Sequence, residues 1–107
     1  MKFGLKTEIV EEIEKILARF PQVKTVIIYG SRAKGNYRQG SDIDLTFKGN
    51  DLNLKILNQI SLQIDHLLLP YTFDLSVFEQ IDNTDLLDHI ERVGKVFYQK
   101  ELGKIIS

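Results

Sequence analysis

The segment VIIYGSRAKGNYRQGSDIDLTF, residues 26–47, limits the possible fold more than any other part of the chain. Its first residues complete a run of β-branched and aromatic side chains that predicts a buried strand over residues 23–29. Three glycines and several polar or basic side chains then predict a loop over residues 30–40, with a helical turn that starts at Ser31. A second strand is predicted over residues 41–47, so the segment is expected to fold as strand, polar loop and strand.

The second predicted strand alternates cleanly between apolar and polar side chains. Its apolar face is expected to hold Ile43, Leu45 and Phe47, and its polar face Asp42, Asp44 and Thr46. The carboxylates of Asp42 and Asp44 should then lie within about 7 Å of each other. Like charges this close repel one another unless a positive charge lies between them. Hard divalent cations prefer oxygen ligands, so the pattern indicates a metal site.

The rest of the chain alternates between helical and strand patterns. The expected helices cover residues 8–20 with Thr7 as a cap, residues 52–68 with Asn50 or Asp51 as a cap, and a last helix from Asn83 or Thr84 to just before Gly94. Further strands are expected at residues 71–78 and 95–99. This order predicts an α/β or α+β domain, a small mixed sheet with its helices packed on one face. The open face would carry Asp42, Asp44 and Asp74.

Composition narrows the class of protein. The 107 residues predict one domain that covers residues 1–107. A net charge of −1 gives no sign of a nucleic-acid or membrane partner. Cysteine is absent, which excludes disulfides, thiolate metal ligands and cysteine nucleophiles. No apolar run reaches the roughly 18 residues of a membrane span, and the N-terminus lacks the apolar centre of a signal peptide. We therefore expect a cytoplasmic protein.

Asp74 adds a third carboxylate, because alternation places it on the polar face of its strand. Three carboxylates suit two metal ions, about 3.5–4 Å apart, that clamp the attacking and leaving oxygens of a phosphoryl or nucleotidyl transfer. Histidine offers no comparable signal: His66 and His89 lack a partner at metal-ligand spacing and are expected at the surface or the core boundary. Tyr29 is expected to pack in or beside the sheet.

The glycine turn supplies the complementary half of such a site. Gly30 lets a ligand approach the backbone closely, and Ser31 offers a hydroxyl and a backbone N–H. Arg32 and Lys34 add positive charge that suits a triphosphate. A lone Gly-Ser is usually only a turn, and a lone Asp-x-Asp is usually solvated surface. Their combination at two strand ends favours a site for a magnesium nucleotide.

The sequence GSRAKGNYRQGSDIDL resembles the Gly-Ser-x₁₀-Asp-x-Asp signature of the DNA polymerase beta-like nucleotidyltransferase superfamily. The small size of the chain resembles the minimal nucleotidyltransferase (MNT) branch. The resemblance implies that Gly30 and Ser31 contact the nucleotide phosphates and that Asp42 and Asp44 bind both Mg²⁺ ions. It further implies that Asp74 completes one metal site and helps to deprotonate the incoming hydroxyl.

The family motif often has arginine where this chain has Lys34, and lysine keeps the charge but not the bidentate geometry. MNT proteins are commonly encoded beside a helical HEPN ribonuclease toxin. The resemblance therefore implies the antitoxin of a type VII-like toxin–antitoxin pair, which transfers AMP from ATP to a toxin hydroxyl, with tyrosine as the expected acceptor. Two alternatives stay open: an antitoxin that only binds, and a nucleotidyltransferase subunit that modifies a small molecule. The acceptor platform is expected to come from another chain.

Overall fold

Helices and strands alternate along residues 1–100, the part of the chain that the computed structural model describes. The elements are α1 (Thr7–Ala18), β1 (Val23–Tyr29), α2 (Ser31–Lys34), β2 (Ile43–Gly49), α3 (Leu54–Asp65), β3 (Phe73–Val77), a 3₁₀ turn (Phe78–Gln80), α4 (Thr84–Val93) and β4 (Lys95–Gln99). Their order confirms the predicted α/β organisation. Within these residues, none of the helices has the length and apolar character that crossing a bilayer requires.

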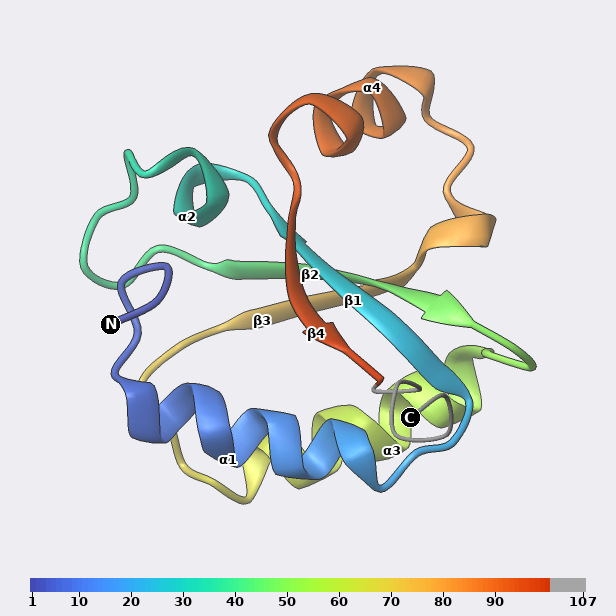
Figure 1. Cartoon of the computed structure of the whole chain (residues 1–107), viewed down its shortest axis with the longest axis horizontal. Helices are drawn as coiled ribbons and strands as arrows, with labels where there is room; N and C mark the ends of the chain where they lie inside the picture. The colour runs from blue at the N-terminus through green and yellow to red at the C-terminus, as the bar shows by residue number, and fades with distance from the viewer. Residues whose placement is uncertain (101–107) are drawn as a thin grey trace, which may run out of the picture.

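The four strands form one mixed sheet in the order β3-β2-β1-β4 (Figure 1). β1 runs antiparallel to both β2 and β4, whereas β2 and β3 are parallel. A parallel pair needs a crossover connection, and α3 provides it between β2 and β3. β2 is therefore an inner strand with an antiparallel neighbour on one side and a parallel neighbour on the other.

The main hydrophobic core lies between the sheet and the pair α1 and α3, which share one side of it in Figure 1. Ile13 and Leu17 of α1 and Ile60 of α3 are fully enclosed there. The inward residues of the strands complete the core, namely Val26, Ile28, Ile43, Leu45 and Phe47. Their alternation along β1 and β2 leaves the other side chains of these strands on the opposite face.

α4 departs from the expected layering, because it packs on the opposite face of the sheet (Figure 1). Its buried residue Ile90 lines a cavity of about 600 Å³ with Ile27 of β1 and Lys48 of β2. Gly94, where α4 ends, lies so near that a β-carbon there would be 2.8 Å from Cγ2 of Ile27. The apolar side of α4 covers Ile27, a residue that the core on the other face cannot reach.

Several element boundaries differ from the predicted ones. α1 has Lys6 as its N-cap without a side-chain hydrogen bond, so the predicted cap at Thr7 is wrong. α3 starts later than predicted because the side chain of Asn53 accepts a hydrogen bond from the N–H of Ile56. It ends at Asp65, and Leu68 beyond it has a φ of 55°.

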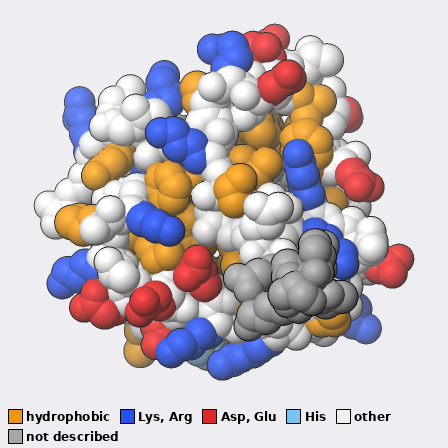
Figure 2. Space-filling model, in the orientation of Figure 1, with side chains coloured by type: hydrophobic (Ala, Val, Ile, Leu, Met, Phe, Trp, Pro, Cys, Tyr) orange, Lys and Arg blue, Asp and Glu red, His pale blue; other side chains and the backbone are white. Residues whose placement is uncertain are grey.

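Acidic and basic side chains are mixed over the face of the molecule in Figure 2, in keeping with the small net charge.

Candidate active site

One row of side chains crosses three strands on the face opposite the main core. In the sheet register, Tyr29 of β1 is paired with Asp44 of β2, and Asp44 is paired with Asp74 of β3. Neighbouring strands lie about 4.8 Å apart, and paired residues point to the same face. The register therefore brings Asp44 and Asp74 together, although 30 positions separate them in the numbering.

Asp42 lies just outside the strand that was predicted to contain it, because β2 begins at Ile43. Its side chain is exposed, as is that of Asp74, whereas Asp44 is partly buried. Burial raises the pKa of Asp44 above its ordinary value, and the negative charges of Asp74 and Asp42 raise it further. The three predicted carboxylates thus act on one another electrostatically, and Asp44 is at their centre.

The donor set fits Mg²⁺ better than it fits a closed metal cage. Among residues 1–100, no three carboxylate or imidazole side chains converge as a ready-made metal centre. Mg²⁺ usually keeps several waters and binds one or two carboxylates together with substrate phosphates. Asp44 and Asp74, with Asp42 beside them, supply oxygen ligands and a concentration of negative charge that a divalent cation would relieve.

Gly30 connects β1 to α2 and adopts a backbone conformation that only glycine takes readily, with φ 76° and ψ −156°. Space is also limited, since a β-carbon at Gly30 would lie 2.5 Å from Oδ2 of Asp44 and would force that side chain to move. The glycine turn and the aspartate of the neighbouring strand are therefore in direct contact. Ser31 follows as the first residue of α2 and is partly exposed, and Lys34 at its end is exposed.

Arg32 has a different position from the one predicted for it. Its side chain is 2% exposed, and its guanidinium donates to the carbonyl oxygens of Ser41 (3.1 Å) and Phe3 (3.0 Å). The aromatic rings of Tyr37 and Tyr71 each lie 5.1 Å from its central carbon. These contacts hold the guanidinium within the loop, so Arg32 supports the loop between the two halves of the motif, and its burial argues against the phosphate contact expected from its sequence position.

His89 belongs to the site although it was not predicted as a site residue. The N–H of Gly30 donates a hydrogen bond to Nε2 of His89, 3.1 Å away. The His89 ring meets the ring of Tyr29 nearly edge-on, at 6.2 Å between centroids and 78° between planes. The apolar spacing of Leu86 and Val93 on α4 places His89 on the same helical face, which was the only available signal.

Tyr29 lies at the other end of the row, and its phenol group is neutral. Its side chain is 8% exposed. Burial raises the pKa of Tyr29, and the charges of Asp44 and Asp74 raise it further. A neutral tyrosine beside two carboxylates gives the site an apolar wall, with the two aspartates as its polar part.

The chain is similar to known proteins in sequence and in fold. Residues 11–102 match the family described as Polymerase beta, Nucleotidyltransferase. A protein of Methanocaldococcus jannaschii, described as a "putative protein adenylyltransferase", is 29% identical over 97 residues, which cover 81% of this chain and 93% of that protein.

Two solved structures share the fold. The crystal structure of a toxin–antitoxin pair with AMP-PNP matches with a TM-score of 0.69 and 20% identity, over 91% of this chain and 78% of that chain. The complex of a tri-AMPylated Shewanella oneidensis HEPN toxin with its MNT antitoxin matches with a TM-score of 0.65 and 17% identity, over 95% of this chain and 79% of that chain. The family match includes the glycine turn and all three aspartates, and the chain belongs to the polymerase beta nucleotidyltransferase family.

Proposed function

We propose that this chain transfers AMP from ATP to a hydroxyl group of a protein, in a reaction that depends on two Mg²⁺ ions. The observation that carries the proposal is the pairing of Asp44 with Asp74 directly beside the turn at Gly30. A triphosphate and an aspartate pair are both negatively charged and repel each other. The aspartates can therefore hold the triphosphate only through metal ions that bind both. Nucleotidyl transfer needs this combination of carboxylates and a phosphate-binding turn.

Each part of the site has a role in this reaction. Ser31 and Lys34 would bind the phosphates, and Asp42, Asp44 and Asp74 would hold the metal ions. Bound Mg²⁺ would supply charge neutralisation at the transferred phosphate. The acceptor oxygen would form a bond to the α-phosphorus as the bond to the bridging oxygen breaks and pyrophosphate leaves.

The proton of the acceptor hydroxyl needs a base in this step. Asp74 is the most exposed end of the carboxylate row, on the edge strand β3, and is the group we propose to receive the proton. Asp44 is enclosed by Asp74 on one side and Tyr29 on the other, which suits a metal ligand. The exposed side of the row is also the direction from which a large acceptor can approach.

The proposed acceptor is a tyrosine on a HEPN-type toxin, which would make this chain the antitoxin of the pair. Support comes from the relatives: one is described as a protein adenylyltransferase, and the solved structures with this fold include an MNT antitoxin with an AMPylated HEPN toxin. A cytoplasmic location is part of the proposal, since ATP and such a toxin would be available there.

The test uses the purified chain, ATP labelled in the α-phosphate, Mg²⁺ and the protein encoded beside it. Label should appear on that protein only with Mg²⁺, and the double variant Asp42→Ala/Asp44→Ala should transfer none. Mass spectrometry would then locate the modified residue. Tight association without any label would contradict transfer to this acceptor and support an antitoxin that acts by binding. Label on a small molecule instead would contradict the protein acceptor.

A further inference from the structure

The helix α4 contributes one hydrogen bond to the glycine turn. The donor is the backbone N–H of Gly30 and the acceptor is Nε2 of His89, at 3.1 Å and across 59 positions of sequence. Gly30 directly follows β1, whereas His89 lies on α4, on the face of the sheet that carries the aspartates. This contact links α4 directly to the proposed phosphate-binding turn.

The contact defines the protonation of the imidazole. Nε2 accepts the hydrogen bond, so it carries no proton, and the ring is neutral with its proton on Nδ1. The edge-on packing against Tyr29 fixes the plane of the ring. The acceptor atom therefore has a fixed direction, and the ring lies close to the carboxylate row.

The residue that donates this hydrogen bond, Gly30, has a backbone conformation that needs support. Glycine loses more conformational freedom on folding than any other residue, and Gly30 adopts a φ of 76° and a ψ of −156°. A rotation of the peptide between Tyr29 and Gly30 would redirect Ser31, the next residue. It would also move the α-carbon of Gly30 relative to Oδ2 of Asp44, where the spacing is tight.

We propose that His89 is a positioning residue for nucleotide binding. Its Nε2 holds the Tyr29–Gly30 peptide in the orientation that presents Ser31 to the phosphates and keeps the turn against Asp44. His89 acts through Gly30 and not on the reacting atoms. The effect on nucleotide binding rests on the proposed function, whereas the hydrogen bond and the tautomer of His89 do not.

The first test compares three variants in their binding of α,β-methylene-ATP with Mg²⁺, measured by calorimetry without an acceptor. His89→Leu removes the acceptor atom and should weaken binding about tenfold, because a partly buried N–H is left unpaired. His89→Gln can place its Oε1 near the position of Nε2 and should bind within about threefold of wild type. His66→Leu is the matched control, an exposed histidine at the C-cap of α3, and should bind as wild type does.

Thermal unfolding of the same variants separates positioning from folding. His89→Leu should unfold at a lower midpoint than His89→Gln because it leaves the Gly30 N–H unpaired, but both should be fully folded at the temperature of the binding measurement, so that the difference in nucleotide affinity reports positioning. Equal affinities of His89→Leu and wild type would overturn the proposal, and so would an equal loss in His89→Leu and His89→Gln. If wild type and all variants fail to bind the nucleotide analogue, the proposed function is wrong instead.

The second test does not depend on nucleotide. The chain has two histidines, so ¹⁵N spectra of its imidazoles can be assigned by comparison with His89→Gln. His89 should show the tautomer with a proton on Nδ1, and the amide of Gly30 should shift when His89 becomes leucine. A proton on Nε2 of neutral His89 would overturn the proposal whatever the affinity measurements give.

Discussion

Gly30 and Asp44 are so close that a β-carbon on the glycine would lie 2.5 Å from Oδ2 of the aspartate. The two halves of the sequence motif, Gly-Ser and Asp-x-Asp, are thus joined by a steric contact as well as by the pairing of their strands. A substitution at either residue should therefore alter the position of the other.

Gly30→Ala should destabilise the fold by about 3 kcal/mol or more and abolish transfer, since it combines backbone strain with a displaced Asp44. Gly35→Ala is the matched control. Gly35 also has a positive φ, 89°, but no atom lies within 4 Å of its added β-carbon. Its cost should be about 1 kcal/mol, with transfer retained. Urea denaturation and the labelling assay measure both quantities, and equal costs for the two variants would contradict the contact.

Asp44→Asn should raise the stability of the metal-free protein at neutral pH while it abolishes transfer. The pKa of Asp44 is raised, so the folded state binds the proton more tightly than the unfolded state does. Its contribution to stability is therefore lost as the pH rises from the ordinary carboxyl pKa through the raised one. Thermal unfolding between pH 4 and pH 8 should show that wild type loses stability relative to Asp44→Asn over this window. A difference in stability between the two proteins that does not change with pH would contradict this prediction.

Mg²⁺ should act on the same charges. It should raise the unfolding midpoint of wild type, because it binds the folded state, and raise that of Asp44→Asn much less. Removal of the ion with a chelator should restore the metal-free midpoint. An identical response of the two proteins would show that the ion binds away from Asp44.

Arg32 and Lys34 should respond in opposite ways to the same substitution. Arg32→Met should cost about 2–4 kcal/mol of stability, since it leaves the partly buried carbonyl oxygens of Ser41 and Phe3 without a donor. Lys34→Met should change stability by less than about 0.5 kcal/mol, because the side chain is exposed, yet weaken nucleotide binding. Chemical denaturation and calorimetry separate the two effects. A stable Arg32→Met with weak nucleotide binding would restore the phosphate contact to Arg32.

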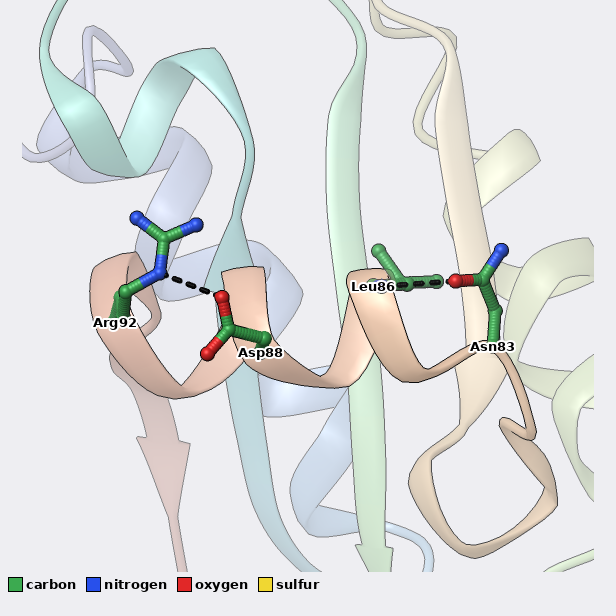
Figure 3. Close-up of polar contacts among 4 residues, drawn as sticks. All are labelled: Asn83, Leu86, Asp88 and Arg92. Atoms are coloured by element: carbon green, nitrogen blue, oxygen red, sulfur yellow. Dashed lines mark hydrogen bonds and ion pairs between the residues drawn. The ribbon is translucent and has the colours of Figure 1, made fainter.

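The N-terminal cap of α4 contributes to the stability of the helix that carries His89. Asn83 caps this helix by accepting a hydrogen bond from the N–H of Leu86 at 3.1 Å, as Figure 3 shows. Asn83→Ala should therefore cost about 1 kcal/mol. The ion pair between Asp88 and Arg92 on the same helix is exposed, so Arg92→Ala should cost no more than about 0.5 kcal/mol. Denaturation midpoints of the two variants provide the comparison.

The sequence predicted those parts of the site that depend on local patterns. The bounds of β1 match the prediction because its residues are dense in β-branched side chains, and the alternation of β3 correctly placed Asp74 with Asp44. Arg32 was misplaced because a basic side chain in a glycine-rich loop is usually solvated, and burial between two tyrosines leaves no short motif. His89 could not be found from sequence because its contact joins residues 59 positions apart.

The site depends on the edge strand β3, which carries Asp74. β3 is five residues long, lies at the edge and pairs only with β2 among the described strands, so it is held on one side alone. Segments of this kind open by local fluctuations that cost less free energy than global unfolding. If β3 separates from β2, Asp74 leaves Asp44 and the core loses Val77, whereas the pairing of β1 with β2 and β4 does not involve β3. Catalytic competence would thus be lost in a state that most probes of folding still record as native.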